Sequence, residues 1–212
     1  MPDPNSPASE KTLKVLNLYA GIGGNRKLWK NVQVTAVEND PDIAKVYQDF
    51  FPNDTVIIGD AHEYLLEHYQ EFDLIWASPP CQSHSSFRQN ICVTSGQSKP
   101  GYIDLKLYQE IIFLEHNYKG IWLVENVRPY YEPLIKPTAV IARHYYWSNK
   151  PLIIDIKASA DNIHYAQIPE LSLRHGFDLS NYKLKNKRQV LRNCVSPEVG
   201  EYLFNSLAER TK

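Results

Sequence analysis

The sequence predicts an α/β fold built on a doubly wound, mostly parallel sheet. Five apolar runs of strand length recur up to residue 127, and stretches with the apolar spacing of helices lie between most of them. Each run ends at a glycine, a proline or an acidic residue, which are typical of turns and helix starts. The chain has 212 residues, 43% of them hydrophobic, which is enough for one substantial domain with a packed core.

The predicted strands and helices follow one another in order along the chain. The strands cover residues 13–20, 32–38, 55–60, 72–78 and 120–127. The intervening helices cover 25–31, 41–51, 61–69 and 104–117, and the second of them has Asp40 as its cap and Pro41 as its first residue. Beyond these, the sequence indicates strands at 139–149 and 151–156 and helices at 169–175 and 197–210. Residues 82–101 are polar, serine-rich and irregular, and loops of that length are usually functional.

Composition limits the class of protein and its domain organisation. The polar, proline-rich start lacks the apolar core of a signal peptide, and no apolar run is long enough to span a membrane. Three cysteines suit a reducing compartment, so we expect a soluble cytoplasmic protein. A net charge of -1 argues against a strongly basic coat protein but leaves room for a local basic patch. We expect a flexible tail (1–12), a catalytic core (13–149), a minimal connecting segment (150–180) and a C-terminal segment that completes the core (181–212).

The ends of the first three strands predict a cofactor site, because parallel sheets bind ligands at the carboxyl ends of their strands. A glycine-rich turn leaves backbone amides open to a ligand, and an acid after the second strand suits a ribose diol. An acid after the third strand suits the adenine amine, although a helix cap is an equally good reading and uses only one oxygen. Taken singly, the glycine-rich turn could be only a turn and the acids only surface or capping residues. The spacing of the glycines departs from GxGxxG, which disfavours a dinucleotide. Together they indicate an adenosine-containing cofactor held by Tyr19, Ala20, Gly21, Gly23, Gly24, Glu38, Asn39, Asp60 and Ala61.

The fourth strand ends in two prolines and a cysteine, which raises the question of whether Cys81 is core packing, a metal ligand or a nucleophile. Two rigid residues present the thiol at the mouth of the sheet, and we expect a helix start there to favour the thiolate. Glu125 ends the fifth strand and faces the same cleft if the two strands are neighbours. A zinc site is disfavoured because Cys81 and His84 give only two ligands. Cys92 and Cys194 are read as small buried hydrophobic residues.

Six ordered motifs resemble the cytosine-5 DNA methyltransferase family. They are LNLYAGIGG, VEND, GDAHEYL, ASPPCQ, WLVENV and RQVLRNCVSPEVGEYL, the last of which resembles the RQxGNAVPP segment of the family, and HGFDLSNY echoes the segment before it. The resemblance runs from Leu13 to Leu203 in the family's order. It implies a Rossmann-like, S-adenosylmethionine-dependent methyltransferase fold, and a cysteine after the prolines separates carbon-5 chemistry from exocyclic amine methylation.

The resemblance implies roles for individual residues. Cys81 is the covalent nucleophile, Glu125 binds ring N3 with a pKa that burial raises, and Arg143 holds the base carbonyl or orients Glu125. A structural salt bridge is the alternative for Arg143, because Tyr145 stands where the family has a second arginine. Pro79, Asn193 and Val195 join the S-adenosylmethionine site. The implied substrate contacts are Pro80, Gln82, Ser85, Arg88, Asn126 and Val127.

The implied partner is double-stranded DNA, from which the target base must flip out beneath the 82–101 segment as a lid. The recognition domain that family members carry is missing, so selectivity is loose or comes from the lid or a partner chain. Residues 183–188 and Arg192 contact phosphates or are simply solvated. Methylation of RNA, a non-catalytic DNA-binding or regulatory homologue and a dinucleotide oxidoreductase remain alternatives.

Overall fold

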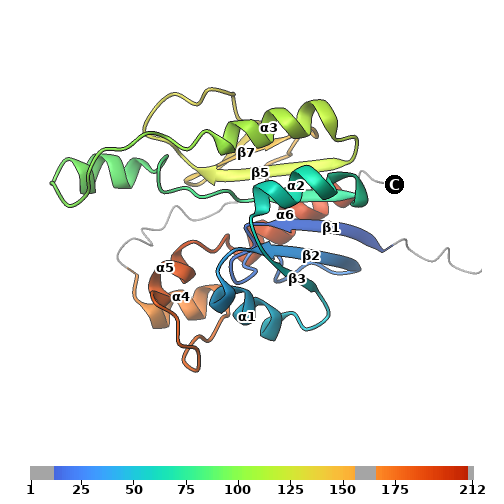
Figure 1. Ribbon diagram of the computed structural model, residues 1–212, viewed down its shortest axis with the longest axis horizontal. Coiled ribbons are helices and arrows are strands. Elements are labelled where there is room, and N and C mark those ends of the chain that lie inside the picture. Colours follow the sequence, from blue (N-terminus) through green and yellow to red (C-terminus); the bar gives the residue numbers. More distant parts are fainter. Residues whose placement is uncertain (1–11, 156–165, 210–212) are drawn as a thin grey trace, which may run out of the picture.

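The computed structural model describes residues 12–155 and 166–209, and its architecture confirms the predicted fold class (Figure 1). A seven-stranded sheet has the order β3-β2-β1-β4-β5-β7-β6. The first five strands run parallel, whereas β7 is antiparallel to both β5 and β6. The strands are β1 (Leu13–Leu18), β2 (Val32–Glu38), β3 (Thr55–Ile58), β4 (Leu74–Ala77), β5 (Ile121–Val127), β6 (Ala139–Ile141) and β7 (His144–Ser148).

The described residues also form six α-helices and two short helices. The α-helices are α1 (Pro41–Phe50), α2 (Ala61–His68), α3 (Lys106–Asn117), α4 (Ile168–His175), α5 (Lys187–Arg192) and α6 (Pro197–Ala208). A 3₁₀ turn, η1 (Tyr69–Glu71), follows α2, and a π-helix, η2 (Arg88–Val93), lies in the long segment after β4. Asp40 caps α1 by accepting hydrogen bonds from the amides of Asp42 and Ile43, as its position before Pro41 predicts.

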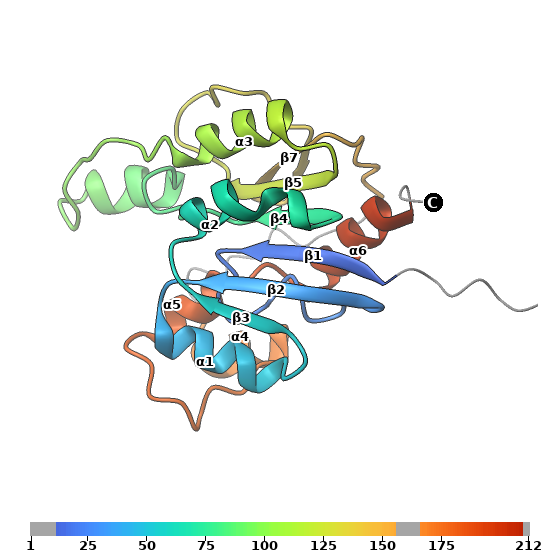
Figure 2. The ribbon, with the colours of Figure 1, turned by 45° about the vertical axis from the view of Figure 1, so that its right-hand side comes forward.

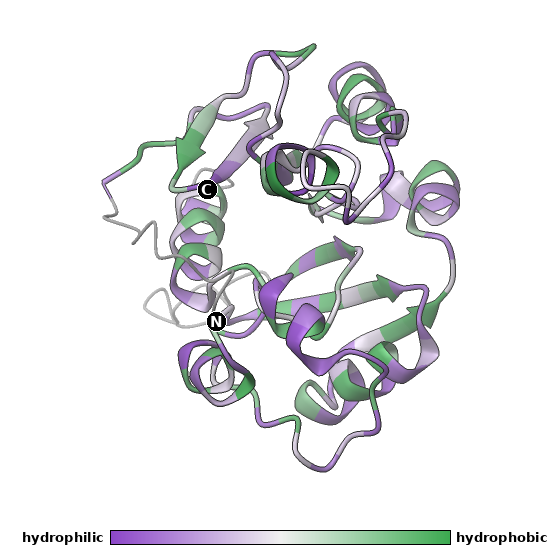
Figure 3. Ribbon diagram, turned by 90° about the vertical axis from the view of Figure 1, so that its left-hand side faces the viewer, coloured by the Kyte–Doolittle hydropathy of each residue, from purple (hydrophilic) through white to green (hydrophobic). Residues whose placement is uncertain are grey.

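Alternation along the central strands sends side chains to two opposite layers. On one face, Val15 and Trp76 pack with Phe204 of α6. On the other, Leu16 and Ile75 pack with residues of α2 and α3 (Figure 2). Figure 3 shows the same arrangement as apolar strands with helices that are apolar on one side. These layers hold the strand ends rigidly, which fixes the loops that follow them.

A third cluster joins distant parts of the chain at one edge of the fold. Val46 of α1, Leu171 of α4 and Leu191 of α5 are buried together, with Phe177 between them. The final third of the chain therefore packs against the first helix, and α5 is held beside the carboxyl ends of β1 and β2 (Figures 1 and 2).

The structure departs from the predicted elements in five places. The predicted strand at 139–149 is two antiparallel strands, β6 and β7, joined by a turn at residues 142–143. Residues 25–31 form turns rather than a helix, because the Asn25 side chain pairs with Asn17 and Gly200 of α6 packs directly on the Asn25 backbone. Residues 151–155 form no strand, and α5 was not predicted. The 82–101 segment contains η2 and is not wholly irregular. Most of the predicted N-terminal tail and the centre of the connecting segment lie outside the described residues.

In the described ranges, none of the helices combines the length and the apolar character that crossing a bilayer requires.

Candidate active site

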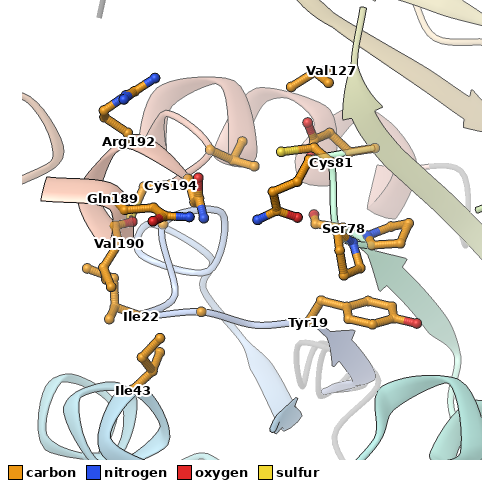
Figure 4. A pocket seen from close by; sticks show the side chains of 18 of the residues that line it. Tyr19, Ile22, Ile43, Ser78, Cys81, Val127, Gln189, Val190, Arg192 and Cys194 are labelled. Carbon is orange, nitrogen blue, oxygen red and sulfur yellow. The ribbon is translucent and has the colours of Figure 1, made fainter. Parts of the chain in front are cut away.

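A cavity of about 800 Å³ opens at the carboxyl ends of the parallel strands (Figure 4). Its walls come from the loops that follow β1, β2, β4 and β5, from the turn before β7 and from α5 with the residues after it. A volume of this size is typical of a small-molecule site. The structure therefore brings six separate stretches of sequence to one hollow at the edge of the sheet where ligands were expected.

Glu38 ties the glycine-rich turn to the end of β2. Its Oε2 accepts from the Gly21 amide at 3.0 Å and its Oε1 accepts from the Asp40 amide at 2.9 Å. Burial raises the pKa of Glu38, and these backbone donors oppose the rise. Each oxygen keeps a second lone pair, so the carboxylate retains acceptor capacity toward the cavity.

The glycine-rich turn also meets the last motif of the chain. A Cβ atom on Gly24 would lie 2.6 Å from the Val195 carbonyl oxygen and 2.9 Å from Cβ of Cys194. Only glycine allows this approach, which places Asn193 and Val195 on the cavity wall next to the turn. The two motifs are far apart in sequence, and their contact builds one side of the candidate cofactor site.

Four of the predicted site residues are not among those that line the cavity: Gly23, Asp60, Ala61 and Arg88. Gly23 has φ +83° and packs against the rings of Tyr47 and Phe51. Asp60 caps α2 through Oδ1, while its Oδ2 lies 3.4 Å from Nζ of Lys106. An Arg88 Nη2 donates to the Lys99 carbonyl at 3.1 Å within the 82–101 segment. The cavity is lined by the other predicted residues, Tyr19, Ala20, Gly21, Gly24, Glu38, Asn39, Pro79, Pro80, Cys81, Gln82, Ser85, Glu125, Asn126, Val127, Arg143, Asn193 and Val195.

Cys81 and Glu125 line the same cavity because β4 and β5 are adjacent parallel strands. The Asn126 side-chain amide donates to the Pro79 carbonyl at 3.0 Å and so fixes the proline turn against the end of β5. Glu125 is only 7% exposed. Burial raises its pKa to about 7, against the opposing effects of the Ser78 hydroxyl and the Arg143 charge. The expected rise in the pKa of this acid is confirmed.

The Cys81 thiol is not activated in the way that the sequence predicted. Burial raises its pKa to about 11, the Glu125 charge raises it further, and the charges of Arg143 and Arg192 act against this rise. Residues 82–84 form a turn in which the amides of His84 and Ser85 donate to the Cys81 carbonyl, and helical residues begin only at 86, beyond the thiol. Burial and the Glu125 charge outweigh the groups that lower the thiol pKa, so the expectation of a favoured thiolate is wrong.

Two side chains near the Cys81–Glu125 pair, Ser78 and His144, were missed by the sequence reasoning, and Arg192 was expected only as a phosphate contact or a solvated residue. Nε2 of His144 lies 3.6 Å from Oε1 of Glu125, and burial lowers the pKa of this imidazole to about 3. The register of β5 and β7 explains the contact, since Val127 faces His144 and Glu125 faces Tyr146. A signal for His144 existed only in its position next to Arg143.

Tyr145 lies on the opposite face of the sheet from Glu125. It packs with the apolar cluster that lies between the sheet and helices α2 and α3. Its ring meets that of Trp147 edge to face, with the two ring centroids 6.1 Å apart. Since neighbouring residues of a strand point to opposite faces, the residue after His144 is directed away from the acid. Arg143 remains on the cavity wall, where its charge influences both Glu125 and Cys81.

The fold is similar to that of the Entamoeba histolytica methyltransferase EhMeth, with a TM-score of 0.57 and 14% identity over 96% of this chain and 100% of that chain. A weaker likeness links it to Spodoptera frugiperda DNMT2, with a TM-score of 0.39 and 23% identity. That match covers 54% of this chain and 35% of the other. No curated protein gives a significant match. The family model for C-5 cytosine-specific DNA methylases matches residues 13–132, which is more than half of the chain, and the protein therefore belongs to that methyltransferase family.

Proposed function

We propose that the protein transfers a methyl group from S-adenosylmethionine to carbon 5 of a flipped-out cytosine in DNA, through a covalent adduct with Cys81. One observation carries the proposal. The Cys81 thiol and the buried Glu125 carboxyl line the same cavity as the glycine-rich turn and Glu38. One cavity thus contains a nucleophile, an acid that is partly protonated near neutral pH, and a wall that suits a cofactor.

The residues on the cofactor side fit an adenosine-containing sulfonium compound. A Cβ placed on Gly21 would meet no atom within 4 Å, so the backbone there is open to a ligand. Glu38 keeps acceptor capacity for a ribose diol, and the acidic side chains of Asp40 and Asp42 also line this end, which suits a positively charged ligand. When bound, S-adenosylmethionine supplies an electrophilic methyl group to carbon 5.

Glu125 and Cys81 divide the work of making carbon 5 nucleophilic. The Cys81 thiol loses its proton to solvent, the resulting thiolate forms a bond to carbon 6, and Glu125 gives its proton to ring N3, so that the electron pair of the C5–C6 double bond is delivered to carbon 5. After methylation a base removes the proton from carbon 5, the carbon 6–sulfur bond breaks, and N3 returns its proton to Glu125. The proposed base is water.

The neutral form of Glu125 serves the reaction twice. It donates to N3, and it lacks the negative charge that raises the pKa of the Cys81 thiol. Because burial brings the pKa of Glu125 to about 7, a substantial fraction of the protein holds this acid in its neutral form at physiological pH. The two groups titrate as a coupled pair, so their protonation states are best described together.

The proposed substrate is duplex DNA, and residues 82–101 act as the lid over the flipped base. Only a short segment separates the end of β7 at Ser148 from the start of α4 at Ile168, which is too short for an independent recognition domain. Sequence selectivity then comes from the lid, from α4 and α5 or from a separate partner chain.

Covalent trapping tests the proposal. DNA that contains 5-fluorocytosine should form an adduct with the wild-type protein in the presence of S-adenosylmethionine, because fluorine blocks the loss of the carbon 5 substituent. Cys81→Ala should form none, whereas Cys92→Ala, a matched control in the 82–101 segment, should form it normally. RNA that carries the same base runs in parallel. An adduct that survives in Cys81→Ala would refute the nucleophile, and an adduct with RNA alone would replace DNA as the substrate.

A further inference from the structure

Arg192, at the end of α5, lies across the cavity from Cys81 (Figure 4). It immediately precedes Asn193, which also lines the cavity. Its guanidinium carbon lies 5.9 Å from the centroid of the Phe87 ring, which belongs to the segment that follows Cys81 and also lines the cavity. An arginine and an aromatic ring from two distant stretches therefore share one rim.

Charges of opposite sign are separated within the cavity. Glu38, Asp40 and Asp42 line it beside the end of β2 and the start of α1. Arg143 and Arg192 also line it, and both lower the pKa of the Cys81 thiol, which places their charges near the sulfur. The charge of Arg192 also helps to lower the pKa of Arg143, an effect second only to burial. Two guanidinium groups that act on each other beside a cavity form a favourable place for an anion.

The same rim offers the other groups that nucleic acid backbones use. The hydroxyl-bearing side chains of Ser85 and Ser86 line the cavity next to Phe87. Guanidinium groups and hydroxyls bind phosphate oxygens, and an aromatic ring offers a surface on which a base can stack. In a nucleotide the base and the phosphate lie at opposite ends of the sugar. A base held against Cys81 thus directs its phosphate away from the sulfur.

We propose that Arg192, supported by Phe87, binds a backbone phosphodiester next to the cytosine that reaches Cys81. This inference rests on the proposed function and assigns to α5 a contact with the nucleic acid strand. It makes α5 part of the substrate-binding surface of a chain that has no room for a separate recognition domain between β7 and α4.

The test is the salt dependence of nucleic acid binding by wild type, Arg192→Gln and Arg192→Lys, measured by fluorescence anisotropy. Each phosphate contact contributes about 0.9 to the slope of log K against log salt for duplex DNA. Arg192→Gln should therefore lower the slope by about 0.9 and weaken binding about tenfold near physiological salt. Arg192→Lys should retain most of the slope. Lys119→Gln removes the same charge at an exposed position before the amino end of β5, whereas the cavity lies at the carboxyl ends of the strands, and it should leave the slope unchanged.

Two further measurements separate the alternatives. Binding of S-adenosylhomocysteine should stay within about twofold of wild type in Arg192→Gln, and a large loss there would assign Arg192 to the cofactor and overturn the inference. An unchanged salt slope would also overturn it. Duplex DNA, single-stranded DNA and RNA of one sequence show which strand the site accepts. If the wild-type protein is trapped by 5-fluorocytosine DNA but Arg192→Gln leaves the salt slope unchanged, the phosphate site is refuted and the proposed reaction is not. If Arg192→Gln changes the salt slope but the wild-type protein forms no adduct, the proposed reaction is refuted and the phosphate site is not.

Discussion

Replacing Glu125 with glutamine should make the Cys81 thiol more acidic. The thiol pKa rises from its usual 9.0 to about 11, and burial is the largest cause. The charge of Glu125 is the next cause, while Arg143 and Arg192 act in the opposite direction. Glutamine keeps the shape of the side chain and removes the charge, so burial and both arginines continue to act.

The expected size of the effect follows from this order of causes. The net rise of the thiol pKa is about two units, which corresponds to about 2.7 kcal/mol. Since the carboxylate contributes less than burial does, we expect Glu125→Gln to lower the thiol pKa by about one unit. That change gives about ten times more thiolate at pH 8. A weaker base is also a poorer nucleophile, which leaves alkylation roughly threefold faster at that pH.

The assay is the rate of iodoacetamide alkylation of Cys81 between pH 6 and pH 11, followed by mass spectrometry of the peptide that contains it. Cys81→Ala gives the background from Cys92 and Cys194. Glu115→Gln, an exposed residue on α3, removes one carboxylate far from the thiol and should not move the midpoint. A midpoint that stays in place or rises in Glu125→Gln would refute the electrostatic coupling of the acid and the thiol.

Three predictions concern stability. Gly24→Ala should lower the free energy of unfolding by about 2 kcal/mol in urea titrations, because its Cβ would meet the Val195 carbonyl oxygen at 2.6 Å; an unchanged midpoint would contradict this contact. Asp40→Ala should cost about 1 kcal/mol through the lost cap of α1, whereas Asp40→Asn should cost little. Burial lowers the pKa of His175 from 6.5 to about 4. As the pH is lowered from 6.5 to 4, the imidazole is therefore protonated in the unfolded chain but not in the folded protein, and the free energy of unfolding falls by up to about 3 kcal/mol. His175→Gln should flatten this part of the stability curve, and an equally steep fall would refute the assignment.

The sequence predicted the parts of the fold that depend on local pattern. The five parallel strands follow from apolar runs, and α1 begins where Asp40 and Pro41 placed it. The α5 helix was missed because its charged start, which continues the basic run of residues 183–188, looked like a solvated segment. Its burial depends on Leu191 packing against α1 and α4, a contact that no local pattern shows.

In the site, too, the features that depend on strand order were predicted from the sequence, and those that depend on tertiary packing were not. Strand adjacency brings Cys81 and Glu125 to one cavity, and a buried acid was expected to have a raised pKa, as Glu125 has. The state of the thiol was predicted wrongly because it depends on burial and on the Glu125 charge, both of which are tertiary properties. The residues after Cys81 could not reveal whether a helix or a turn follows, since serine and histidine suit both.

Strand register decides which side chain accompanies the acid. In β7, residues at even positions share the face of Glu125, because Tyr146 is its direct partner on β5. An arginine at position 145 would lie on the other face, among the apolar residues under α2 and α3, and would not reach the carboxyl. Arg143 reaches the cavity only because it precedes the strand, in a turn where Ala142 has φ +52°. Tyr145 at this position therefore removes no cation from the acid, whose neighbours are Arg143 and the imidazole of His144. Burial lowers the pKa of that imidazole to about 3, so it stays neutral at physiological pH. Arg143 and the Ser78 hydroxyl lower the pKa of Glu125 less than burial raises it, and this balance favours the protonated carboxyl that the proposed reaction requires.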